Sequence, residues 1–546
     1  MNLTMGVWSW SDLLDGGGPE GEYGVRLNPS NERPRLEDVS TTQDGAQYQL
    51  ACGAFIGARR LPSGDFLLIP DLLGLRPIYF TESFVADSFL ELLEAVKDDA
   101  RGGLHLDAHS VMHFLEFGYP PPGLTILKGI YRTCPGEVVI IGPSGVKRLT
   151  ANENPLGMAA SSEFSESMTY LAERMSALVA DIRHPASVDV TGGGDSRVLA
   201  AFSSFSPTVK EASCSYSTSE ADEIRIGKEV SRKVGLDYHF VCAPGFNSLD
   251  DVEASFEYVD GQGDILDALR HRKMQVERAS RGIEVSLSGI GGELFKDFWW
   301  LQDFPWYRRK RPDLDRLFRL RVNSSPMRIK GLSSEFSSAL EVARSSCRER
   351  ISGVGAKGRV NTEAYDRIYY WEKMANVPVP FVVGGAKHGV AVCPVLLDPS
   401  LVSCGYGLPR RMRFLDRVHR RWISASPVPG VGAIPTTAGT TLKAGWAGEM
   451  TDGLGWFLNK VKRLGSKMVE RATGRVQWRK TPNQPDSVDK LIEIGDELGV
   501  IKELGKYRVV EEGVESLKDL DRARAGRFCC LGLTLKALGS DKRSNG

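Results

Sequence analysis

The sequence of 546 residues lacks several features that would assign it to a class of protein at once. No apolar run approaches the roughly 20 residues that a membrane-spanning helix needs, so we expect no membrane partner. The first residues, MNLTMGVWSWSDLLDGGG, have neither the basic start nor the apolar core of a signal peptide. No segment is biased enough in composition to predict extensive disorder. These absences favour a soluble globular protein and a cytoplasmic location.

Paired cysteines and a net charge are lacking as well. The nine cysteines are scattered and form no CxxC pair; a disulfide framework or a zinc site needs regular spacing, so we expect reduced thiols. The 69 basic side chains balance the 69 acidic ones, but residues 1–150 are acidic and residues 408–480 are basic. A basic segment of this kind is most often a solvated face, so we expect no nucleic-acid partner.

The texture of the sequence changes near residue 150. Residues 1–150 contain short apolar runs bounded by Gly or Pro, which predict a β-rich domain with one helix near 107–117. Residues 165–546 begin with alternating strands and helices and become mostly helical from about residue 305. The alternation predicts an open parallel α/β sheet. Its expected strands are 187–190, 212–216, 237–242 and 283–287, and its expected helices include 221–234 and 264–280.

A glycine-rich loop follows the strand expected at 187–190. It consists of Thr191-Gly192-Gly193-Gly194-Asp195-Ser196 and runs into a predicted helix. Consecutive glycines let the backbone turn tightly with several N–H groups pointing inward, and a helix N-terminus adds positive potential. The loop therefore predicts an anion site, where Asp195 suits a Mg²⁺ ion that bridges a bound phosphate. A plain tight turn is the simpler alternative, because the loop matches neither GxxxxGK[ST] nor GxGxxG.

Several segments resemble one known family. The loop resembles the SGGxDS pyrophosphate loop of the ATP pyrophosphatase superfamily, with Thr191 in place of the first serine. The segment Ser288-Gly289-Ile290-Gly291-Gly292-Glu293 resembles the SGxGxDE segment of the asparagine synthetase family within it. Asp222-Glu223 resembles the DE that opens a helix of that family, and Pro394-Val395-Leu396-Leu397-Asp398 is similar to a weak form of its PFLD region.

The first 150 residues agree with this resemblance. Residues 71–80 and 124–136 are similar to the D..G..PLYY and T...GI…PG elements of the family's glutaminase-type domain. The resemblance implies a degenerate Ntn-hydrolase-like β-rich sandwich over residues 1–150. Over residues 165–546 it implies an ATP-pyrophosphatase domain of the asparagine synthetase type, with the parallel sheet of the adenine nucleotide alpha hydrolase-like fold and a helical C-terminal part. A homodimer is compatible with it.

The resemblance implies an ATP-dependent ligase that forms AMP. A carboxylate, from a small molecule or a peptide, would be adenylated with release of pyrophosphate, and an amine would then displace AMP to form an amide. The residues implied around adenosine are Val190, Tyr216, Ser288 and Gly289. Those implied on pyrophosphate are Thr191, Gly192, Gly193, Gly194, Asp195 and Ser196. Asp195 and Glu293 would bind Mg²⁺, and Lys443 is the candidate for the family's late catalytic lysine, with Lys387 as the second choice.

The sequence also departs from the family. Asn2 stands where glutamine-hydrolysing members have a nucleophilic cysteine, and the nearest cysteine is Cys52, so we expect no glutaminase activity. Ile290 stands where the related asparagine or β-lactam synthetases have Glu or Tyr, and it can neither take nor give a proton. Val392-Cys393 replaces an arginine before the PFLD region. Degenerate N-terminal domains of this kind occur in β-lactam synthetases and lasso-peptide cyclases.

These departures leave alternatives open. The chain is typical either of an active ligase or of an asparagine synthetase-like partner protein without catalysis. A sulfur-transferring ATP pyrophosphatase would share the first loop but usually has the paired cysteines that are missing here. Trp299-Trp300 and Trp306 are typical either of a substrate pocket or of ordinary core. The identity of the carboxylate and of the amine is open.

Overall fold

The computed structural model describes most of the chain. The residues described are 1–14, 17–29, 32–97, 104–151, 164–303, 306–445, 448–450, 452, 465, 469, 473 and 485–539. Most of the polar connection near residue 155 and of the basic segment 460–480 lies outside them. Among the described residues, no helix has the length and apolar character that crossing a membrane requires.

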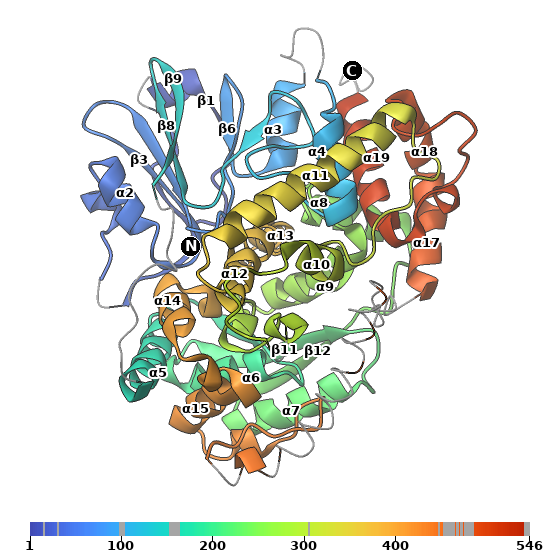
Figure 1. Cartoon of the computed structure of the whole chain (residues 1–546). Helices are drawn as coiled ribbons and strands as arrows, with labels where there is room; N and C mark the ends of the chain where they lie inside the picture. Colours follow the sequence, from blue (N-terminus) through green and yellow to red (C-terminus); the bar gives the residue numbers. More distant parts are fainter. Residues whose placement is uncertain are drawn as a thin grey trace.

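A parallel sheet of five strands organises the larger part of the chain (Figure 1). The strand order is β12-β11-β10-β13-β14, and every neighbouring pair is parallel. The strands are β10 (Ala186–Asp189), β11 (Val209–Tyr216), β12 (Asp237–Cys242), β13 (Val285–Leu287) and β14 (Ala391–Cys393). The predicted open parallel sheet is therefore confirmed. The sequence did not predict β14, because its three apolar residues within a helical region are too few to show a period.

Helices connect these strands as the alternation predicted. They are α6 (Gly194–Phe202), α7 (Asp222–Val234), α8 (Leu249–Tyr258) and α9 (Ile265–Ser280). The chain moves outward from β10 to β12 and then crosses back to place β13 on the other side of β10. The strand order thus reverses at the carboxyl ends of β10 and β13, which is where open α/β sheets bind ligands.

Two antiparallel sheets form the β-rich N-terminal part. One has the order β2-β3-β4-β8-β9 and the other β1-β6-β5-β7. Their side chains share one buried cluster, which includes Ile56 and Phe66 from the first sheet and Phe80 and Val85 from the second, so the sheets pack face to face. Their strands are β1 (Val7–Ser9), β2 (Gly21–Leu27), β3 (Cys52–Arg60), β4 (Phe66–Pro70), β5 (Tyr79–Phe80), β6 (Phe84–Ala86), β7 (Tyr131–Arg132), β8 (Glu137–Gly142) and β9 (Gly145–Thr150).

The expected helix near 107–117 is present as α4 (Ala108–Phe117). The prediction of a single helix in this part was wrong, because α1 (Trp10–Leu14), α2 (Thr42–Tyr48) and α3 (Phe89–Val96) also form. In α3 the buried side chains Phe89, Leu92, Leu93 and Val96 follow helical spacing over only eight residues. A stretch this short is easily mistaken for a strand.

The C-terminal part is helical, as predicted, and returns to the N-terminal part. The helix α19 (Ala525–Gly539) packs against α3, α4 and α9, and Figure 1 shows it beside α4 and α18. One buried cluster therefore joins α3 and α4 to α8, α9 and the C-terminal helices. The remaining helices are α5 (Phe164–Ala180), α10 (Leu314–Leu317), α11 (Ser334–Ala356), α12 (Asn361–Ile368), α13 (Val379–Lys387), α14 (Pro399–Gly407), α15 (Arg417–Ala425), α17 (Pro485–Glu497) and α18 (Val500–Lys506).

Asp260 connects the N-terminal part to the larger part of the chain through hydrogen bonds and an ion pair. It is buried, accepts hydrogen bonds from Ser88 Oγ at 2.7 Å and Phe89 N at 2.6 Å, and pairs with Lys387 Nζ at 2.7 Å. Because Phe89 begins α3, the Asp260 carboxylate also lies at the positive end of that helix. Lys387, the second choice for a catalytic lysine, is thus engaged in this structural pair.

Asp260→Ala tests this contact. We expect the free energy of unfolding to fall by about 3–5 kcal/mol, because the change leaves the Lys387 ammonium and several donors unpaired. Lys387→Met in the same chain should recover part of the loss, since it removes the unpaired charge. Urea unfolding of the single and double variants measures both effects, and a loss below about 1 kcal/mol for Asp260→Ala would contradict the role given to this contact.

Candidate functional site

Two glycine-containing loops meet at the carboxyl ends of β10 and β13. A Cβ atom on Gly289 would lie 3.1 Å from Ser196 N, and one on Gly292 would collide with the carboxylate of Asp195. Glycine is therefore required at 292 by the close approach of the first loop. The two segments, almost 100 residues apart in sequence, form one site because β10 pairs directly with β13.

Hydroxyl groups fold the first loop. Ser196 Oγ accepts a hydrogen bond from Thr191 N at 3.2 Å, and Thr191 Oγ1 accepts one from Gly193 N at 3.2 Å. The helix α6 begins directly after, at Gly194, and its N-cap residue Gly193 has no side chain with which to cap it. The N-terminus of α6 therefore opens onto the loop, as an anion site requires.

Asp195 is engaged by two side chains that the sequence analysis did not find. Lys296 Nζ lies 2.8 Å from its carboxylate, and His419 Nε2 lies 2.6 Å from Oδ1. A carboxylate only accepts, so His419 Nε2 carries the proton and donates it. Burial would raise the pKa of Asp195, but the Lys296 ammonium and the hydrogen bond from His419 outweigh it and hold that pKa well below its usual range.

Lys296 is held as a charged group. Burial would lower the pKa of its ammonium, but the carboxylates of Asp195 and Asp416 outweigh burial and raise it. The residue lies just beyond η5 (Gly292–Phe295), the short helical turn of the second loop. One indication of Lys296 was present in the sequence, namely its position three residues after Glu293. His419 lies in α15, and nothing in the sequence indicated that it reaches Asp195.

The predicted second metal ligand, Glu293, has a protein partner as well. Burial and a hydrogen bond to the Glu293 carboxylate both raise the pKa of the Tyr369 hydroxyl, which donates to it. Tyr369 begins η8 (Tyr369–Met374). In the described part of the chain, no three His, Cys, Asp or Glu side chains gather closely enough to hold a metal ion. With Asp195 paired to an ammonium and Glu293 to a hydroxyl, the arrangement does not fit the two-carboxylate Mg²⁺ site that the sequence predicted.

The residues predicted around adenosine lie on the same edge of the sheet. Val190 N donates to Ser213 O at 3.0 Å, and the buried Ser288 N donates to Cys393 O at 3.0 Å. Tyr216 ends β11, the strand next to β10, and the guanidinium carbon of Arg270 lies 5.9 Å from its ring centroid. Ile290 is half-buried and packs against the central core.

The segment 434–442, which follows α15, packs against the glycine-rich loop after β10. Thr437 N donates to Gly192 O at 3.2 Å, and Arg197 Nη2 donates to Pro435 O at 3.0 Å. Leu442 lies 3.4 Å from the position of a Cβ on Gly194. Lys443 follows at once but is exposed, and its carbonyl accepts from Arg420 Nη1 at 2.8 Å. The lysine that the structure brings to Asp195 is thus Lys296, and the family role proposed for Lys443 stays a prediction.

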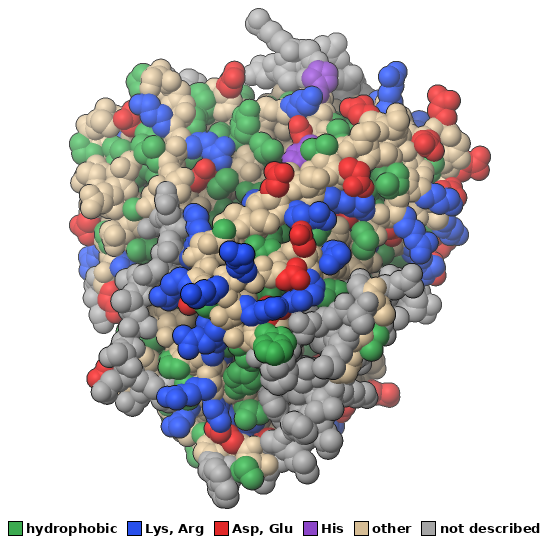
Figure 2. All heavy atoms as spheres, viewed as in Figure 1, with side chains coloured by type: hydrophobic (Ala, Val, Ile, Leu, Met, Phe, Trp, Pro, Cys, Tyr) green, Lys and Arg blue, Asp and Glu red, His purple; other side chains and the backbone are tan. Residues whose placement is uncertain are grey.

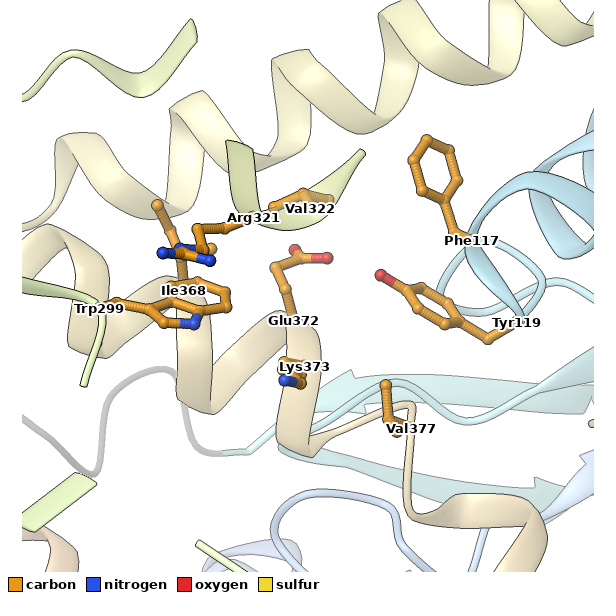
Figure 3. A pocket seen from close by; sticks show the side chains of 9 residues that line it. All are labelled: Phe117, Tyr119, Trp299, Arg321, Val322, Ile368, Glu372, Lys373 and Val377. Atoms are coloured by element: carbon orange, nitrogen blue, oxygen red, sulfur yellow. The ribbon is translucent and has the colours of Figure 1, made fainter. Parts of the chain in front are cut away.

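A small cavity of about 100 Å³ lies close to the second loop (Figure 3). Trp299 lines it, and its ring packs edge-on against the ring of Tyr369, with the centroids 5.2 Å apart. Glu372 also lines it and pairs with Arg350 at 2.8 Å. Tyr369 thus contacts both Trp299 of the cavity wall and Glu293 of the second loop. Its lining residues are Phe117, Tyr119, Trp299, Arg321, Val322, Ile368, Glu372, Lys373 and Val377.

The other two tryptophans named from the sequence do not line this cavity. Trp300 is fully buried and donates to Asp366 Oδ1 at 3.1 Å, so it belongs to the core. Trp306 is largely exposed. The open choice between pocket and core therefore has a different answer for each of the three residues.

Basic side chains gather on one face of the molecule, over the region of α10 to α12 (Figure 2). Arg308, Arg309, Lys310 and Arg311 are exposed in succession there. Burial and the neighbouring Arg308 both lower the pKa of Arg410, which indicates how closely the positive charges crowd. A face of this kind attracts anions from solution.

The ion pair of Asp195 predicts a dependence of stability on pH. The folded-state pKa of Asp195 is depressed, so its contribution is complete above the unfolded-state value of about 4 and is lost as the pH falls through the folded-state value. We expect the difference in unfolding free energy between the natural protein and Asp195→Asn to shrink below about pH 4. Urea unfolding at a series of pH values measures it. Asp222→Asn, which removes an exposed surface pair, is the control, and a difference that stays constant down to pH 3 would contradict the assignment.

Comparison with known proteins adds no family to this description. No protein-family model matches the chain. No curated protein matches it either. The functional interpretation therefore depends on the residues of the site and on their geometry.

Proposed function

We propose that the protein is an ATP-dependent, AMP-forming carbon–nitrogen ligase of the asparagine synthetase type. A carboxylate oxygen of the substrate attacks the α-phosphate of ATP, pyrophosphate leaves, and an acyl-adenylate forms. The nitrogen of an amine then attacks the acyl carbon, loses a proton, and AMP leaves. The observation that carries this proposal is the TGGGDS loop at the reversal point of the sheet, packed against the glycine loop of the neighbouring strand.

The chain's own groups suit the binding of a polyphosphate. The N-terminus of α6 and the folded loop offer backbone N–H donors, and Lys296 offers a positive charge beside them. Val190, Ser288 and Gly289 line the part assigned to adenosine, with Tyr216 beside the base. The basic face over α10 to α12 would raise the local concentration of an anionic nucleotide.

The cavity beside Tyr369 is our choice for the carboxylate substrate. Its walls are mainly aromatic and apolar, and it also contains the basic residues Arg321 and Lys373. Lys373 Nζ lies 5.4 Å from the centroid of the ring of Tyr369, whose hydroxyl donates to Glu293. A pocket of this composition suits a substrate with an apolar body and a negatively charged group.

Glutaminase activity is not part of the proposal. Cys52 is fully buried in β3, and a hydrogen bond with Cys393, together with burial, raises the pKa of its thiol. A thiol held protonated in the core is a poor nucleophile. The amine would therefore come from solution or from the substrate itself.

A non-catalytic partner protein is the rival proposal. It is favoured by Ile290, which packs against the core where the related synthetases have an acid or base. In that case the fold would remain while the chemistry is lost. Binding of ATP separates the two, because a partner protein has no need to retain it. No observation on the described residues favours a sulfur-transferring enzyme.

The proposal predicts release of AMP and pyrophosphate from ATP when a suitable carboxylate and an amine are present. Asp195→Asn should lower this release by at least about a hundredfold, because it releases Lys296 from the position in which the carboxylate holds it at the phosphate loop. Chromatography of the nucleotides over a panel of carboxylates, with a coupled pyrophosphate assay, measures it. Lys502→Met, which changes an exposed lysine on α18, is the comparison for a general loss of charge. Formation of ADP instead of AMP would contradict the proposed reaction.

A further inference from the structure

The carboxylate of Asp195 already has a cation beside it. Lys296 Nζ lies 2.8 Å from Oδ1 and 2.8 Å from Oδ2, so the ammonium bridges both carboxylate oxygens. The same nitrogen lies 4.0 Å from the position of a Cβ on Gly194. The ammonium is therefore held directly over the start of α6, where the loop would receive a phosphate.

This position is the one that a divalent ion would need. Asp195 Oδ1 also accepts the hydrogen bond from His419, whose ring is fully buried, so both carboxylate oxygens are engaged by protein groups. Glu293 accepts from Tyr369. A Mg²⁺ ion bound to Asp195 would have to displace Lys296, which is largely buried beside it. A divalent ion and the Lys296 ammonium therefore compete for the same position beside Asp195.

The charge balance at the loop gives Lys296 a role. An isolated Asp195 carboxylate at the N-terminus of α6 would repel a phosphate group. An ammonium 2.8 Å away offsets the charge of Asp195. The carboxylates of Asp416 and Glu293 also lie close enough to act on this ammonium, and the helix terminus and the backbone N–H groups attract the anion. Lysine binds phosphate as a compact point charge, and it needs no particular coordination geometry to do so.

We propose that Lys296 is the built-in cation of this site, and that the loop binds the phosphates of ATP without a divalent metal held by the protein. The inference depends on the proposed function, since it assumes that the loop is the phosphate site. It deepens that function by naming the group that neutralises the polyphosphate. It also replaces the two-carboxylate Mg²⁺ site that the sequence predicted.

Calorimetric titration with ATP and with inorganic pyrophosphate tests the proposal, each in excess EDTA and in excess Mg²⁺. For the natural protein, we expect Kd values in EDTA within about threefold of those in Mg²⁺. Lys296→Met should weaken binding in EDTA by at least about tenfold, because Asp195 then repels the phosphates. Added Mg²⁺ should restore part of the loss, since the carboxylate becomes free to bind a metal. Lys502→Met, which changes an exposed lysine on α18, should bind like the natural protein.

Several results would overturn the proposal. Binding by the natural protein that requires Mg²⁺ would overturn it while leaving the proposed ligase intact. Metal-independent binding that Lys296→Met does not weaken would show that another group supplies the charge. No binding of either probe, with or without Mg²⁺, would overturn the proposed function together with the inference. If Lys296→Met proves poorly folded, Lys296→Arg replaces it as the test. Because this variant retains a positive charge, its Kd in EDTA should lie within about threefold of that of the natural protein. A loss of affinity as large as about tenfold would count against the inference.

Discussion

The parallel pairing of β10 with β13 is the constraint on which the site depends. It brings the loop after β10 and the loop after β13 to the same edge of the sheet, where glycine at 292 lets the second loop approach Asp195. The strand order reverses between these two strands, which is where open α/β sheets bind ligands. Backbone N–H groups, the N-terminus of α6 and Lys296 come together at this edge.

The packing around this edge explains why the rest of the chain is needed. The loop is covered on one side by the segment from Ile434 to Leu442 and supported on the other by His419 from α15. Tyr369, from the turn after α12, joins Glu293 to the cavity wall at Trp299. The N-terminal part contributes Phe117, at the end of α4, and Tyr119 to the same cavity. This part thus helps to form the proposed substrate pocket.

The sequence predicted those features that are encoded locally. The strand at 237–242 matches β12, and the helix at 264–280 matches α9 to within one residue, because each has a clear period and flanking turn residues. The TGGGDS loop could be identified because its hydroxyls and glycines act within six residues. In contrast, β14 has three residues and no period of its own, and α3 is too short to be distinguished from a strand.

The partners of Asp195 could not be predicted in the same way. His419 is 224 residues away in sequence and Lys296 is 101 residues away, so only the folded chain brings them together. Reasoning from family spacing directed attention to Lys443, whose neighbour Leu442 does reach the loop while Lys443 itself is exposed. Similarly, the two carboxylates that suggested Mg²⁺ are each engaged by a protein side chain, which residue types alone do not reveal.

A crystal structure of the protein grown with ATP would test the central claim most directly. We expect the β- and γ-phosphates to lie against the backbone N–H groups of residues 192–196, with Lys296 Nζ within hydrogen-bonding distance, and the adenine to lie near Tyr216. Nucleotide bound at another place, or a loop that stays filled by Thr437 and Leu442 at saturating ATP, would contradict it.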